Sequence, residues 1–170
     1  MSRDDISVHF LPEFRRRLSR RWLRSVVEQT LEREGLQNPV EVGVVIADDE
    51  TVQGLNNDYR GLDETTDVLA FAFQTFSDPG TLAEPNAEPT DGFIEPPQQP
   101  LNLGEVVVSY PQAKRQAAAR GGRIAEEAAL LVAHGVLHLL GYDHAEPLQE
   151  RVMWKKQDAV VAALFPKGHQ

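Results

Sequence analysis

The feature that most constrains the fold is an apolar segment in the last third of the chain. The stretch "IAEEAALLVAHGVLHLLG" (124–141) is apolar on nearly all sides when it is placed on a helix. A helix of that kind has to be buried. Gly141 ends it, because glycine lets the chain reverse direction. We therefore expect a central helix over 123–140, with the other elements packed around it.

Three of the chain's five histidines lie within "HGVLHLLGYDH" (134–144). His134 and His138 are four residues apart and share one helix face, and His144 follows the turn. A lone histidine in an apolar helix is usually a hydrogen-bonded core residue. Burying three imidazoles without partners is costly, however, and a shared cation removes that cost. The spacing predicts a metal site with three histidine ligands and a fourth position open for water.

A metal held by three imidazoles lowers the pKa of bound water from about 16 towards about 7. The spacing is that of the metzincin peptidases, H-E-x-x-H-x-x-G-x-x-H, with one difference. Gly135 stands where those enzymes have the glutamate that acts as general base. The residues therefore predict a metal-dependent hydrolase that is not a peptidase of this kind. Asp143 either orients a ligand imidazole or caps the turn, and both roles remain open.

The rest of the chain alternates between strand and helix patterns. Alternating or β-branched runs predict strands at 6–10, 40–47, 67–73 and 104–110. Helical spacing and capping residues predict helices at 12–34, 50–57, 111–120, 123–140 and 147–164. Strands mixed with helices in 170 residues indicate one α+β or mixed-sheet domain over 1–170.

The segment 74–102 differs from the rest of the chain. It contains six of the eleven prolines, five acidic residues and no lysine or arginine. Because proline cannot donate a hydrogen bond to a sheet, we expect a long acidic loop inserted into the domain. It is either a tolerated surface insertion or a lid over the site.

Composition limits the class of protein. The chain has no cysteine, so a metal ligand must be His, Asp or Glu. The net charge of −9 argues against a protein that coats nucleic acid through bulk electrostatics. Six arginines nevertheless crowd into 15–24, as a solvated outer face or an RNA-facing surface. We expect no signal peptide and no membrane span, in keeping with a cytoplasmic protein.

A second informative stretch is "LNNDYRGLDETTDVLAF" (55–71). We expect Arg60 to lie in the loop between a helix and a strand. The acids and threonines after it are typical of turns and caps. Taken alone, Arg60 is a solvated cation, although a guanidinium also matches the oxygens of a phosphate group.

Together with "LGEVVVS" (103–109), these stretches resemble the YbeY family of bacterial metal-dependent endoribonucleases. The family patterns are close to N-x-x-Y-R-x-x-D-x-x-T-D-V-L-S-F, L-G-D-I-x-I-S and H-G-x-L-H-L-x-G-Y-D-H, and all three occur here in family order. The departures are small. Ala70 stands where the family usually has serine, and Glu105 where it often has aspartate.

The resemblance implies an α+β fold with a four-stranded mixed sheet and about five helices, and a metal site at the end of the buried central helix. The implied ligands of one Zn²⁺ are His134, His138 and His144, although imidazoles also suit Ni²⁺ or Co²⁺. Arg60 would be the catalytic arginine. The implied activity is cleavage of single-stranded RNA, not DNA, in the 3′-end maturation of small-subunit rRNA and in ribosome quality control. The ribosome or its assembly factors would be partners.

Two other classes of protein remain as alternatives. One is a metzincin-like zinc peptidase, which Gly135 argues against. The other is a non-enzymatic ribosome-assembly factor with a structural metal site. Structural zinc sites usually have four protein ligands. That reading therefore needs a further ligand, from Asp143 or from an acid of 74–102.

Overall fold

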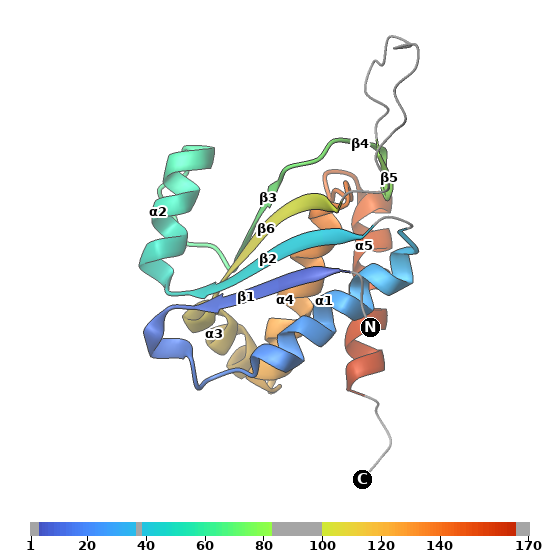
Figure 1. The fold of residues 1–170 in the computed structure, drawn as a ribbon. Helices are drawn as coiled ribbons and strands as arrows, with labels where there is room; N and C mark the ends of the chain where they lie inside the picture. The colour runs from blue at the N-terminus through green and yellow to red at the C-terminus, as the bar shows by residue number, and fades with distance from the viewer. Residues whose placement is uncertain (1–3, 37–38, 83–99, 166–170) are drawn as a thin grey trace, which may run out of the picture.

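The computed structural model describes residues 4–36, 39–82 and 100–165, and its centre is a four-stranded sheet (Figure 1). The strand order is β1-β2-β6-β3. The strands are β1 (Asp5–Phe10), β2 (Val40–Ala47), β6 (Leu101–Ser109) and β3 (Val68–Ala72). The first three are parallel, and β3 runs antiparallel to β6. The predicted α+β fold with a mixed four-stranded sheet is confirmed.

Helices cover both faces of this sheet. In the described ranges they are η1 (Pro12–Phe14), α1 (Arg20–Glu34), α2 (Asp49–Arg60), α3 (Tyr110–Arg120), α4 (Ile124–Leu139) and α5 (Pro147–Leu164). Because side chains alternate along a strand, Val106 and Val108 of β6 join the large core formed with α1, α3, α4 and α5. Val107, between them, packs with Val52 of α2 in a smaller cluster. Helix α2 thus covers one face alone, and α1, α3, α4 and α5 cover the opposite face (Figure 1).

Helix α4 is the central helix that the sequence predicted. Ten of its side chains or glycines are buried. Gly135 is among them, and a Cβ added there would lie 2.5 Å from Cγ1 of Val106. The absence of a side chain therefore lets α4 approach β6 closely, which fixes the helix against the sheet.

Three expectations about the elements are wrong. The helix expected over 12–34 is interrupted, because the Ser19 side chain accepts a hydrogen bond from the Trp22 amide and begins α1 as a cap. The helix expected over 50–57 continues to Arg60, which is therefore helical and not part of a loop. The left-handed Gly61 (φ 68°) ends this helix.

The third correction concerns the inserted segment, which is not loop throughout. Its first part forms a two-stranded ribbon of β4 (Phe76–Asp78) and β5 (Thr81–Leu82), with Gly80 at its turn (φ 77°). Its last residues belong to β6, which begins at Leu101. Residues 83–99 lie outside the described part of the chain. No described helix is long and apolar enough to cross a bilayer.

Candidate metal centre

The C-terminal half of α4 and the turn after it bring together three imidazoles, those of His134, His138 and His144. The ring centroids of His134 and His138 are 4.6 Å apart, and that of His144 lies 5.6 Å and 5.0 Å from them. One ring nitrogen from each histidine lies within 4.8 Å of the others. The first two histidines are half-buried, and His144 is exposed. The predicted cluster therefore forms at the end of the buried helix.

The spacing of the nitrogens fits a metal ion. Zinc–imidazole bonds of about 2.0–2.1 Å put two tetrahedral ligands about 3.3 Å apart. The Nε2 atoms of His134 and His138 are 3.0 Å apart. These two ligands are held by one rigid helix, while His144 is carried by a turn that can adjust. A set of three nitrogens without thiolate suits Zn²⁺, Ni²⁺ or Co²⁺.

Gln157 of α5 forms a hydrogen bond with one of the three imidazoles. Its Oε1 lies 2.8 Å from Nδ1 of His134, and the residue is only 7% exposed. An amide oxygen only accepts hydrogen bonds, so Nδ1 must carry the proton. The lone pair of His134 is then on Nε2, the nitrogen that faces His138. Gln157 therefore fixes the tautomer that a metal ligand needs.

The turn that carries His144 is anchored by α1 and α5. The Tyr142 hydroxyl donates to Oε2 of Glu34 at 2.5 Å, and the Lys156 ammonium donates to Oε1 of the same carboxylate at 3.0 Å. Lys156 also lies 5.2 Å from the centroid of the Tyr142 ring. Asp143 accepts a hydrogen bond from the amide of the next residue, His144, at 2.7 Å, so its carboxylate lies against the backbone of this turn.

The ribbon at the start of the inserted segment contacts the same turn. The Gly80 amide donates to the carbonyl of Leu140 at 2.9 Å. A Cβ added at Gly141, which has φ 96°, would lie 2.8 Å from Cβ of Phe76. This part of the insertion therefore supports the turn between the second and third histidines.

The surroundings of His138 disfavour its protonated form. Burial lowers the pKa of His138 from 6.5 to about 4, and repulsion from His134 and His144 acts in the same direction. A hydrogen bond to the backbone of Tyr142 and the charge of Asp143 oppose this shift. His138 is therefore neutral at pH 7, which is the state in which an imidazole binds a metal.

Arg60 has a different setting from the histidines. It is the last residue of α2, on the opposite face of the sheet from α4, and its side chain is exposed. Within the described ranges it makes no hydrogen bond or ion pair with the three histidines. Its neighbour Tyr59 packs edge-on against Phe71 of β3, with centroids 5.1 Å apart, although 71% of Tyr59 is exposed.

The loop after Arg60 forms hydrogen bonds at the start of β3 and with α2. Asp67 accepts a hydrogen bond from the Val68 amide at the start of β3. The Asn56 side chain donates to the carbonyl of Glu64, across the loop. The expected turn and cap contacts are thus present, and they hold the end of α2 in place.

The sequence argument missed Gln157. A signal was present, because Met153, Gln157 and Val160 occupy one buried stripe of α5 at helical spacing. A polar residue in such a stripe needs a partner. The Tyr142–Glu34–Lys156 contacts had no comparable signal, since they join three separate elements.

Comparison with known proteins agrees with this geometry. The family model described as Endoribonuclease YbeY matches residues 12–164. The chain belongs to the YbeY family. One relative named Endoribonuclease YbeY, from Dehalococcoides mccartyi (strain BAV1), is 42% identical over 154 residues, which cover 91% of this chain and 92% of that protein. Another, from Roseiflexus sp. (strain RS-1), is 36% identical over 160 residues, covering 94% and 92%.

A solved structure shares the fold of this YbeY-family chain. It is the solution structure of TM1509 from Thermotoga maritima, with a TM-score of 0.58 and 22% sequence identity. The match covers 94% of this chain and 89% of that one.

Proposed function

We propose that this protein is a metal-dependent endoribonuclease that cleaves single-stranded RNA. The observation that carries the proposal is the convergence of three imidazole nitrogens within 4.8 Å at the end of α4. RNA as substrate is supported by membership of a family whose relatives are named as endoribonucleases.

In this proposal His134, His138 and His144 hold one Zn²⁺. Bound there, the metal supplies a Lewis acid that polarises a phosphate oxygen and lowers the pKa of water. Gln157 keeps the Nε2 lone pair of His134 available by accepting a hydrogen bond from the Nδ1–H group. Arg60 provides a guanidinium that stabilises negative charge as it builds on the phosphate oxygens. The Arg60 side chain is exposed and is therefore accessible to a phosphate group of the RNA strand.

The cellular role that we propose is 3′-end maturation of small-subunit rRNA and ribosome quality control in the cytoplasm, with the ribosome or its assembly factors as partners. The match of the three sequence stretches to the family patterns supports this role.

The peptidase alternative conflicts with the packing of α4. The general base of a metzincin would stand at residue 135, and there a Cβ alone would lie 2.5 Å from Val106. A glutamate side chain has no room on this side of the helix. The assembly-factor alternative needs a fourth protein ligand, and among the described residues only the three histidines form a cluster with ligand spacing.

Metal content and RNA cleavage, measured on the same preparations, test the proposal. We expect about one zinc per chain in the parent protein and loss of most metal and most cleavage in His138→Ala. His9→Ala is the matched control, since His9 is an exposed histidine of β1. RNA cleavage by a metal-free His138→Ala protein at the parent rate would overturn the proposal. Casein assayed in parallel tests the peptidase alternative.

A further inference from the structure

The start of α1 and the turn before it carry a dense group of basic side chains that the proposed metal chemistry does not use. We call this group the arginine surface. It consists of Arg15, Arg16, Arg17, Arg20, Arg21 and Arg24, and all six are exposed. The chain as a whole has a net charge of −9, so this is a local reversal of its overall charge.

No ion pair in the described part of the chain involves the arginine surface. The three ion pairs found there involve other basic residues, namely Arg115, Arg120 and Lys156. Glu28 lies one turn beyond Arg24, and both residues line an open hollow on the surface. Glu28 forms no ion pair with Arg24. An anionic partner from outside the chain would therefore find the guanidinium groups available.

The arrangement is also unfavourable for α1 itself. The first turn of α1 contains no acidic residue, although the positive end of a helix dipole favours one. Arg20 and Arg24 stand at i and i+4, a spacing at which like charges repel. The electrostatics of the helix therefore do not explain why its first turns carry arginines.

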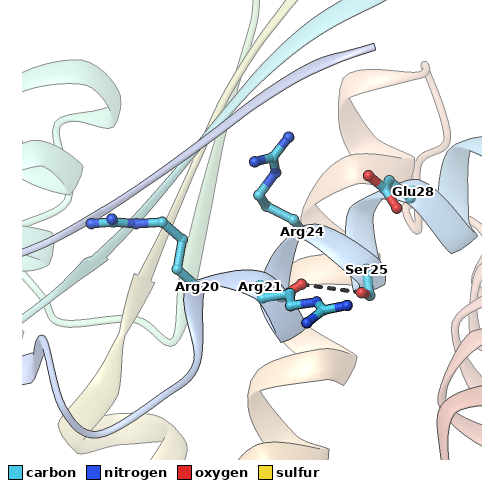
Figure 2. Close-up of a pocket in the computed structure, with 5 residues that line it drawn as sticks. All are labelled: Arg20, Arg21, Arg24, Ser25 and Glu28. Carbon is cyan, nitrogen blue, oxygen red and sulfur yellow. Dashed lines mark hydrogen bonds between the residues drawn. The ribbon is translucent and has the colours of Figure 1, made fainter. Parts of the chain in front are cut away.

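The geometry favours an extended polyanion over a single small ion. Arg20, Arg21 and Arg24 border an open hollow of about 500 Å³, and their guanidinium groups point in different directions (Figure 2). Arg20 is held in place, because its Nε donates to the carbonyl of Val8 at 3.0 Å and the guanidinium lies over the Phe10 ring. Diverging guanidinium groups suit successive phosphates along a strand better than one phosphate.

We propose that the arginine surface binds the phosphodiester backbone of the RNA strand whose scissile part reaches the metal centre. The proposal rests on the proposed function, since it takes RNA as the substrate. Helix α1 links the two places: its first residue, Arg20, belongs to the arginine surface, and its last, Glu34, anchors Tyr142 beside the histidines. The 15 residues of α1 span about 22 Å. Only an RNA extending well beyond the scissile bond can contact both.

The test compares Arg21→Gln/Arg24→Gln with the control Lys114→Gln/Lys155→Gln. Both variants lose two exposed positive charges, and the control positions lie on α3 and on α5. Binding of a long single-stranded RNA is measured by fluorescence anisotropy in the presence of a chelator, so that the RNA stays intact. We expect about 3- to 10-fold weaker binding at 0.1 M salt, with the salt slope reduced by about 1.4, for the arginine-surface variant alone.

Kinetics on the metal-loaded proteins add a second readout. The arginine-surface variant should show a raised KM for long RNA and unchanged kcat and KM for a short oligonucleotide. Equal affinity and equal salt slope in the two variants would overturn the proposal. The proposal would also be overturned if the arginine-surface variant lost binding to anionic lipid vesicles but bound RNA as tightly as the parent protein. If the parent protein cleaves no RNA but the two variants still differ in RNA affinity, the proposed endoribonuclease function is wrong and the RNA-binding role of the arginine surface is retained.

Discussion

Helices α4 and α2 lie on opposite faces of the same sheet and carry the two parts of the proposed site in different ways. Helix α4 is buried along most of its length, and the histidines at its end are held by α5 and by an anchored turn. Helix α2 buries only Val52 and Asn56, and its Arg60 is exposed. The proposed metal ligands are thus preorganised by the core, whereas Arg60 lies in an exposed position at the end of its helix. Substitutions in the two helices should therefore separate metal binding from cleavage.

The largest expected effect is on the α2 side. Arg60→Ala should lower kcat for RNA cleavage by about 100- to 1,000-fold, the range for removing one group that stabilises developing charge. Metal content should stay at the parent level, because Arg60 touches none of the histidines. Single-turnover cleavage and metal analysis on the same sample check this prediction.

Arg60→Lys is the companion variant, since it keeps the charge and loses the planar fork. Cleavage by Arg60→Ala at the parent rate would mean that α2 contributes no catalytic group. Loss of metal in that variant would mean that the two faces of the sheet are coupled.

Among the contacts of the proposed ligands on α4, we expect the Gln157–His134 hydrogen bond to have the largest effect on zinc affinity. Gln157→Leu should weaken zinc affinity by about 10- to 100-fold, because nothing then fixes the His134 tautomer. Gln157→Glu should retain or raise the affinity, since a carboxylate accepts the same proton. Competition with a chromophoric chelator measures both.

The control is Gln149→Leu, at an exposed position of the same helix. An unchanged zinc affinity in Gln157→Leu would contradict the role assigned to Gln157. Nitrogen NMR of the metal-free protein gives an independent readout, because the parent should show His134 protonated at Nδ1.

The difference between residues placed by spacing on one helix and residues brought together by packing explains what the sequence could predict. His134 and His138 were predictable because both lie on one helix, where spacing alone fixes their relation. The sheet and its buried helix were predictable from apolar runs. Gln157 and Glu34 were not assigned, because they reach the site from α5 and α1 through packing that no local pattern records. The break before α1 was missed because Phe14 and Leu18 continue the apolar spacing across a non-helical turn.

One substitution should have opposite effects in the two helices. Gly135→Ala places a methyl group 2.5 Å from Val106 and should destabilise the protein by about 1–3 kcal/mol through overpacking. Gly54→Ala in α2 meets no atom within 4 Å and should stabilise it by about 0.5–1 kcal/mol. Urea denaturation of both variants checks the pair. Equal shifts of the same sign would mean that α4 is not packed more closely than α2.

The last expected effect is a pH dependence of the metal-free protein that originates in α4. The pKa of His138 is about 4 in the folded chain and 6.5 as its ordinary value, so the unfolded chain binds the proton first as the pH falls. This histidine should therefore lower the free energy of unfolding progressively from about pH 6.5 to about pH 4, with no further loss below. The contribution of His138 is the difference between the free energies of unfolding of the parent and His138→Gln proteins, measured by urea denaturation at each pH. The effects of carboxylates that titrate in the same range largely cancel in this difference. Zinc should raise the stability most above pH 6.5, where protons no longer compete for the imidazoles. A difference profile that is flat between pH 6.5 and pH 4 would mean that the end of α4 is as open to water as the end of α2.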